Sequence, residues 1–296
     1  GFVIIFVVMI LGDAFLSEDP SKPEYDYPWL LELPLHMALP FVFVLLVAFA
    51  WSSGSESQDF LNLGEILNGL FSYDFLAARS ENGFFDYLGA LLGVGYMVSG
   101  YGTVVGHDLS HRTRDKKSVI EARWLLSASC NADFAIEHVY GHHVTVGTKE
   151  DPATARRGEN VYAFSIRSTV MGHFSAWKHE LNNLRKKGIN VFSFRNNMIT
   201  GYLMSAFWCV LFYIAGGIFG LMLFLGQAVF AKFVLEIVNY MEHYGLARNS
   251  NQKIGPEHSW NTNKRMSTMV LFSLTKHSAH HEKPRRKYWK LDPYVN

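Results

Sequence analysis

Nine of the 13 histidines fall into four short motifs whose spacing is typical of metal ligands. Histidines four residues apart, or three and four apart, project from one face of a helix about one turn apart, so two imidazoles can reach the same ion. A single histidine is more often a surface or hydrogen-bonded residue, but nine clustered imidazoles repel one another when protonated and are costly to bury without partners. The four motifs together therefore predict a metal centre. They read His107-Asp-Leu-Ser-His111, Glu-His138-Val-Tyr-Gly-His142-His143, Asn-Tyr-Met-Glu-His243-Tyr-Gly and His277-Ser-Ala-His280-His281.

The number and type of these ligands favour two iron ions. Zinc takes three or four ligands, and copper(I) prefers sulfur, whereas the ten methionines do not cluster with the histidines. The first motif is similar to the HExxH sequence of zinc proteases, but Asp108 replaces the general-base glutamate. No Glu-x-x-His occurs in the chain, which excludes the carboxylate-rich di-iron bundle. Imidazole suits iron, and nine ligands divide between two ions with positions left open for a small molecule.

Long apolar blocks, which must position these motifs, indicate membrane-spanning helices. The chain is 49% hydrophobic with a net charge of +1, and a bilayer span needs about 20 apolar residues. The blocks are 2–11, 28–51, 87–105, 199–224 and 228–241. The first has half the length of a span, and because the chain starts at Gly1 without an initiator Met, we expect sequence to precede it. We therefore expect one integral-membrane domain over 1–296, an all-α transmembrane helical bundle with about five helices present.

Basic segments lie on one side of these blocks, which the positive-inside rule makes the cytoplasmic side. The acidic connection at 53–86 falls on the opposite side, and all four histidine motifs lie toward the cytoplasmic face. The near-neutral net charge argues against nucleic-acid binding. Cys130 and Cys209 are too few for a disulfide framework or an iron–sulfur cluster. The basic segments are 112–117, 185–187 and 283–287.

Two polar stretches between the third and fourth blocks also have helical patterns. Residues 118–143 read as helix, but charged residues such as Glu121 and Asp133 argue against a full span. Residues 165–187 are typical of an amphipathic helix lying at the membrane interface.

Three further sequence elements, together with the histidine motifs, indicate a family. They are Ser-Glu-Asp-Pro-Ser-Lys-Pro-Glu at 17–24, Glu150-Asp-Pro-Ala-Thr-Ala-Arg156 and His258-Ser-Trp-Asn261. From about Leu11 to Tyr294 the chain resembles the integral-membrane alkane monooxygenases (alkane omega-hydroxylases), for which NYxEHYG and EHxxGHH are specific. The resemblance implies a fold of six transmembrane helices, the sixth lying before Gly1, and two non-haem iron ions. It implies as iron ligands His107, His111, His138, His142, His143, His243, His277, His280 and His281.

The resemblance also implies a reaction. The reduced di-iron centre uses O2 to hydroxylate the terminal methyl group of a medium-chain alkane, giving a primary alcohol. Electrons come from a rubredoxin, with rubredoxin reductase and NADH upstream, at the cytoplasmic face of the inner membrane of a bacterium. An apolar substrate dissolved in the bilayer can enter between helices while electrons and O2 arrive from the water side. The basic segments offer a surface for an acidic rubredoxin, or they reflect membrane topology alone.

Residues beside the motifs are candidates for contacts with the ligand imidazoles, which commonly donate their other N–H to a carboxylate. A capping or surface role is an equal alternative for Asp108. His36, His173 and His179 have no metal-type neighbours, and we expect them to be structural or interfacial. The candidates are Asp108, Glu137, Asp151, Glu242 and His258.

Two departures from the family pattern leave the ligands intact. Asp108 and Arg112 stand where the first motif usually has Glu and Lys, and Ala279 stands where the last motif usually has Asp. They put substrate preference and the surroundings of the ligands in question.

Two other functions stay open from the sequence. The first is a methyl-arene (xylene-type) hydroxylase or a fatty-acyl desaturase with the same centre. The second is a membrane metal-binding or transport protein, although a transporter places ionisable ligands near the bilayer midplane and these histidines lie at block ends.

Overall fold

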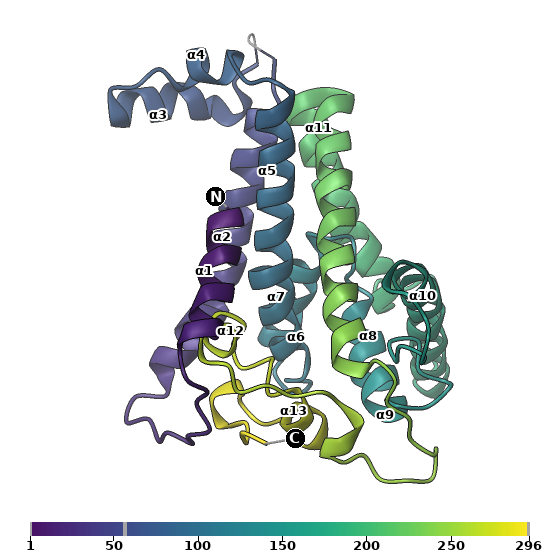
Figure 1. Ribbon diagram of the computed structural model, residues 1–296. Coiled ribbons are helices and arrows are strands. Elements are labelled where there is room, and N and C mark those ends of the chain that lie inside the picture. The colour runs from purple at the N-terminus through teal and green to yellow at the C-terminus, as the bar shows by residue number, and fades with distance from the viewer. Residues whose placement is uncertain (1, 56–57, 295–296) are drawn as a thin grey trace.

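The protein is a bundle of long apolar helices with short helices at both ends (Figure 1). The computed structural model describes residues 2–55 and 58–294, and the described chain is all helical, without a strand. Among the described residues, three helices are long and apolar enough to cross a membrane: α2 (Trp29–Ser52), the continuous helix Phe84–Ser110 and α11 (Asn197–His243). The second of these consists of α5 (Phe84–Met97), the π-helical segment η2 (Val98–Thr103) and α6 (Val104–Ser110). The expected all-α membrane fold is confirmed.

The segment α11 is continuous along the chain, but it folds back on itself in the middle and so forms two helical arms. Gly216 and Gly217 break the helical geometry, and Gly217 has φ of +59°, which favours glycine. The rings of Phe212 and Phe224, on either side of the turn, lie 5.1 Å apart. The arms are therefore 197–215 and 218–243, and the expected blocks 199–224 and 228–241 place the turn wrongly. Hydropathy does not detect this turn, because apolar residues continue through it.

A second helical hairpin replaces the single helix expected over 118–143, so that expectation is wrong. α7 (Lys116–Ser127) ends in a turn where Cys130 has φ of +53°, and the chain returns through α8 (Phe134–Glu137). The side-chain amide of Gln227 donates to the carbonyl oxygen of Ala128 at 2.8 Å, which ties the turn to the second arm of α11. Beyond α8 the chain forms the π-helical segment η3 (His138–His142) and α9 (His143–Thr145).

Buried aliphatic and aromatic side chains join the spans into one core. Leu35 and Leu46 of α2, Leu125 of α7 and Trp208 and Phe212 of α11 are fully buried in it. Large apolar side chains also cover the outside of the long helices, among them Val44, Val210 and Ile218. Such an exposed apolar surface is unusual for a protein in water and is expected for helices that face lipid.

Short helices cover one end of the bundle, where α3 and α4 extend away from it (Figure 1). They are η1 (Phe60–Asn62), α3 (Leu63–Phe71) and α4 (Phe75–Ser80). Arg79 holds this region to the end of α2, because its guanidinium donates to the carbonyl oxygens of Trp51, Ser55 and Gln58.

The opposite end carries the histidine-bearing segments. α10 (Val161–Lys186) confirms the helix expected over 165–187, four residues earlier at its start, while its place at a membrane interface stays a prediction. α1 (Phe2–Phe15) contacts α12 (Arg265–Val270), where the Asp13 carboxylate accepts hydrogen bonds from the backbone N–H groups of Met266 and Ser267. The remaining elements are η4 (Pro256–His258), α13 (His277–Glu282) and η5 (Tyr288–Lys290).

Candidate metal centre

The nine motif histidines converge at this end of the bundle, and all nine are buried. They come from α6 and its C-terminal end, from η3 and α9, from the last residue of α11, and from α13. They form two groups, within each of which one possible ligand atom per residue lies within 4.8 Å of the others. The first group is His107, His111, His138, His143 and His280; the second is His142, His243, His277 and His281.

The Nε2 atoms of the first group face one another at distances that suit a shared ion. His143 Nε2 lies 3.0 Å from His138 Nε2 and 2.9 Å from His280 Nε2, and His280 Nε2 lies 2.9 Å from His107 Nε2. Two nitrogens bound about 2.1 Å from one ion, at right angles, are about 3 Å apart. One N–H cannot serve two facing nitrogens, and Nε2 of His111 has no hydrogen-bond partner in the described chain. The donor set therefore fits a metal ion.

The second group has four members, and their Nε2 atoms also face one another. His277 Nε2 lies 3.1 Å from His243 Nε2 and 3.0 Å from His281 Nε2, and His281 Nε2 lies 3.2 Å from His142 Nε2. The two groups are adjacent, because the rings of His143 and His281 are stacked with centroids 4.3 Å apart. The geometry thus fits two adjacent ions.

The π-helical segment η3 decides how one motif divides between the groups. In an α-helix His138 and His142 would share a face, as the spacing predicts, but a π-helix brings residues five apart together. His138 consequently pairs with His143, while His142 turns to the second group. α13 divides too, because His277 and His281 join one group and His280 the other. The expected sharing of an ion by histidines four residues apart therefore fits His107 with His111 and His277 with His281, but not His138 with His142.

Burial keeps most of these imidazoles in the neutral form that binds metals. It lowers the pKa of His111, His138, His143 and His280 well below the usual value, and the charges of neighbouring imidazoles lower it further. His142 is different: burial lowers its pKa, but the Asp151 carboxylate more than offsets this and raises it.

Two of the candidate carboxylates face ligand imidazoles. Asp151 Oδ2 lies 2.9 Å from Nδ1 of His142 and also accepts the hydroxyl hydrogen bond of Thr154. Glu242 Oε1 lies 3.3 Å from Nδ1 of His277. Asp151 therefore lies where a carboxylate orients the imidazole that it faces. Glu242 is near His277, but Nδ1 of His277 has no hydrogen-bond partner in the described chain.

The other three candidates have different neighbours. Asp108 binds the guanidinium of Arg112 at 2.8 Å, and Arg112 in turn binds Glu32 at 2.6 Å. Glu137 is buried beside α10, and burial and the charge of Asp151 raise its pKa to about 8. His258 belongs to neither group, and its Nδ1 accepts the backbone N–H of Gly255 at 2.9 Å.

The three remaining histidines also lie outside the two groups. His36 Nδ1 is 2.6 Å from Glu121, and His173 Nδ1 is 2.8 Å from Asp133. His179 lies on α10 near Gly141. These contacts are of the structural kind that we expect for them.

An apolar cavity of about 470 Å³ reaches the histidine groups from the side of the spans. His107, His138 and His277 stand at its histidine end, and most of the other lining residues are apolar. Its walls come from α1, α5, η2 and the second arm of α11. The lining includes Phe6, Met9, Tyr96, Phe230 and Val234, which no sequence motif marks.

A small basic cleft of about 160 Å³ approaches the first group from the end of the molecule. His111 lines it, together with the basic residues Arg112, Arg114, Arg285, Arg286 and Lys287. Two of the predicted basic segments, 112–117 and 283–287, therefore lie together beside the site.

Apolar helices with a buried cluster of histidines at one end are typical of metal-dependent membrane proteins. The fatty acid desaturase family model matches residues 84–295. Alkane 1-monooxygenase 1 of Pseudomonas aeruginosa is 36% identical over 99% of this chain and 73% of its own length. Alkane 1-monooxygenase 1 of Alcanivorax borkumensis is 37% identical over 98% of this chain and 69% of its own length. The xylene/toluene monooxygenase hydroxylase component of Pseudomonas putida is 30% identical over 75% of this chain and 61% of its own length.

The chain belongs to the fatty acid desaturase family and, within it, to the alkane 1-monooxygenases. It is accordingly an enzyme, an oxidoreductase with helices suited to a membrane. The resemblance inferred from the motifs is confirmed.

Proposed function

We propose that this enzyme hydroxylates the terminal methyl group of medium-chain alkanes at a non-haem di-iron centre, with electrons from a rubredoxin. The observation that carries the proposal is the apolar cavity that ends at His107, His138 and His277. An alkane has no polar group for the protein to recognise, so it is selected by shape and by burial of its apolar surface. A mainly apolar cavity that reaches the histidine groups can hold such a chain beside them.

The nine histidines are proposed as the iron ligands, five at one ion and four at the other, over a single domain from 1 to 296. Iron bound there would supply the redox chemistry that inserts an oxygen atom from O2 into a C–H bond. The protein itself keeps the imidazoles neutral by burial, surrounds the substrate with apolar side chains and fixes ligand orientation. Asp151 and Glu242 are proposed to provide that orientation through His142 and His277.

The basic cleft supports electron transfer from an acidic donor such as a rubredoxin, itself reduced by NADH through rubredoxin reductase. Its basic side chains lie next to His111, so a negatively charged protein docked there would place its redox group near the first group. The positive-inside rule assigns this basic end to the cytoplasm, and we propose the bacterial inner membrane as the location.

A methyl-arene hydroxylase is the second candidate, favoured by the similarity to the xylene/toluene monooxygenase component. Its substrate is also apolar and also reacts at a methyl group. The two candidates differ in the shape of the molecule that must fit the cavity.

The proposal is tested with purified enzyme in detergent. We expect about two iron ions per chain, and formation of the 1-alkanol from a medium-chain alkane when NADH, rubredoxin reductase and rubredoxin are all supplied. Omission of rubredoxin is the control and should stop product formation. A ring-methyl alcohol from xylene, without reaction of the alkane, would favour the second candidate, and an unsaturated product would identify a desaturase. A protein that binds iron and gives no oxidised product would contradict all three.

A further inference from the structure

One of the three basic segments of the sequence, 185–187, lies apart from the other two. Residues of 112–117 and 283–287 line the basic cleft beside His111, whereas 185–187 ends α10 and leads into the turn before α11. With one further cation in that turn, the segment 185–195 carries four exposed basic residues, Arg185, Lys186, Lys187 and Arg195. The role proposed for the basic cleft therefore does not extend to this segment.

No carboxylate neutralises these four cations within the described chain. In the basic cleft Arg112 pairs with Glu32 at 2.6 Å, but none of the basic residues of 185–195 forms an ion pair. No Asp or Glu occurs from 181 to 235, and Glu180, which precedes this stretch, is buried. Four unpaired positive charges are thus open to a partner outside the protein.

Hydrogen bonds give the turn between α10 and α11 a defined shape. The side chain of Asn196, which is fully buried, donates to the carbonyl oxygen of Val191 at 2.8 Å. Glu180 Oε1 accepts the backbone N–H of Asn197 at 2.7 Å, which ties the start of α11 to α10. The segment 185–195 is therefore a short loop with its two ends tied together.

Two phenylalanines point outward from this loop. Phe192 is 88% exposed and Phe194 is 80% exposed, and the backbone N–H of Phe192 donates to the side chain of Asn190 at 2.8 Å. Large apolar groups with this exposure are unfavourable in water. Aromatic rings beside cations are typical of segments at a membrane surface, where the rings enter the acyl boundary and the charges stay among the headgroups. The loop therefore has the composition of a membrane-surface contact.

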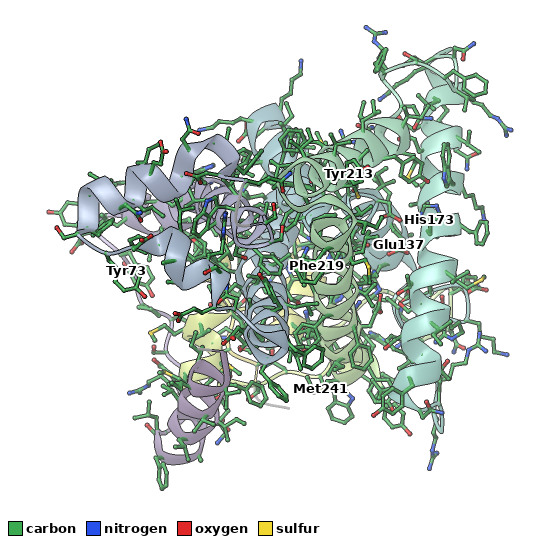
Figure 2. The ribbon with its side chains drawn as sticks, turned by 90° about the horizontal axis from the view of Figure 1, so that it is seen from above. Tyr73, Glu137, His173, Tyr213, Phe219 and Met241 are labelled. Carbon is green, nitrogen blue, oxygen red and sulfur yellow. The ribbon has the colours of Figure 1, made fainter. Side chains whose placement is uncertain are left out.

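The helix that carries this loop lies across the direction of the spans. Figure 2, which looks along the spans, shows α10 lengthwise at the edge of the molecule, with His173 beside it. Trp177 Nε1 of α10 donates to the hydroxyl of Tyr202 at 2.6 Å, and such amphipathic rings are enriched at the level of lipid headgroups. Four side chains of α10, at steps of four residues, are 48% to 70% exposed and apolar or aromatic: Tyr162, Ile166, Val170 and Phe174. These features fit a helix that lies along the membrane surface with the loop at its end.

We propose that the loop 185–195 binds the headgroup phosphates of anionic phospholipids, with Phe192 and Phe194 inserted among the acyl chains. Clustered cations beside a membrane attract its negative lipids, and each cation adds to the attraction. The guanidinium groups of Arg185 and Arg195 can each bind a phosphate through two N–H groups at once. A free phosphate ion would leave both rings in water, whereas a lipid surface accommodates the rings and the charges together. The site is separate from the histidine groups and does not depend on the reaction.

Photolabelling of the full chain in phosphatidylcholine nanodiscs tests the site. The probes are a phosphatidylglycerol and a phosphatidylcholine, each added as a minor component and each with a diazirine at the same position near the glycerol. We expect the phosphatidylglycerol probe to label 185–195 about fivefold more strongly than the phosphatidylcholine probe. The variant Arg185→Gln, Lys186→Gln, Lys187→Gln and Arg195→Gln should lose this preference. The control, Lys149→Gln, Arg156→Gln, Arg157→Gln and Lys253→Gln, removes four other exposed cations and should keep it. Equal loss in both variants would indicate attraction by net charge alone and would overturn the proposal.

The aromatic part of the site has a test of its own. Phe192→Ser with Phe194→Ser should lower the labelling of 185–195 by both probes severalfold, because the rings no longer hold the loop among the acyl chains. Phe84→Ser with Phe85→Ser is the control, at an aromatic pair that is 73% and 82% exposed where α5 begins, and it should leave this labelling unchanged. Equal labelling of the loop by both probes in the unmodified chain would overturn the lipid site. Protection of the loop lysines from acetylation by an acidic rubredoxin would then identify it as a protein-docking surface instead.

Discussion

At the scale of single residues, Asp151 is the carboxylate with the shortest contact to the metal-site histidines. We predict that Asp151→Asn weakens iron binding by about 10- to 100-fold, because His142 then loses the negative charge that orients it and raises its basicity. Competition with an iron chelator measures the change. Glu150→Gln, at an exposed neighbouring carboxylate, is the control and should bind iron as the unmodified enzyme does. Equal iron affinity in the two variants would remove Asp151 from this role.

His243 contributes one of four nitrogens to the second group. His243→Ala should lower the iron content per chain and abolish turnover while helicity, followed by circular dichroism, is unchanged. His36→Ala, at a histidine outside both groups, should keep its iron. A fully active His243→Ala enzyme would exclude His243 from the ligand set.

The identities of the converging histidines could be predicted from their spacing, but their division between two groups could not. The i, i+4 rule assumes an α-helix, and the π-helical segment η3 changes which residues share a face. The surroundings of Asp108 could not be predicted either. Its partner Arg112 also binds Glu32 of α2, which lies far away in the sequence.

At the scale of elements, the turn in α11 depends on a backbone conformation that other residues rarely adopt. Gly217 has φ of +59° and ψ of −145°, with no neighbour near the position of an added Cβ. Gly217→Ala should therefore cost about 1–3 kcal/mol through backbone strain alone. Thermal unfolding in detergent measures it. Gly69→Ala, within α3 and also without a close neighbour, is the control and should be neutral or slightly stabilising. An unchanged melting temperature for Gly217→Ala would contradict this account of the turn.

The apolar blocks predicted the spans, because the length and hydropathy of a span depend only on the local sequence. The two hairpins were missed for different reasons. The turn after α7 is stabilised by Gln227, which lies 99 residues from Ala128, so local patterns carry no sign of it. The turn at Gly216 lies within continuous apolar sequence, where hydropathy is uniform.

At the scale of the whole molecule, an ionic cluster ties the early 17–24 loop to the segment after α13. Asp292 pairs with Lys22 at 2.8 Å and with Arg286 at 2.6 Å. The hydrogen bond from Lys22 and the charge of Arg286 lower the pKa of Asp292 from 3.8 to about 2. A depressed carboxyl pKa stabilises the fold above the unfolded value and loses that contribution as the pH falls toward the folded value.

Asp292→Asn should therefore lower the melting temperature at neutral pH, and the difference from the unmodified enzyme should shrink as the pH falls from about 4 toward 2. Melting curves measured across this range provide the test. Asp26→Asn, at an exposed carboxylate of the same early region, should show little difference at any pH. A gap for Asp292→Asn that is constant with pH would mean that its charge does not stabilise the fold.

The positions of the ligands along the chain constrain how the enzyme is made. His107 lies near the first third of the sequence, whereas α13 supplies His277, His280 and His281 to both groups. The ribosome reaches α13 only after it has synthesised every span, so neither group is complete until α13 has been made. If the groups hold iron as proposed, neither can be filled completely before that point, and a chain truncated before α13 keeps its spans but lacks three of the nine histidines.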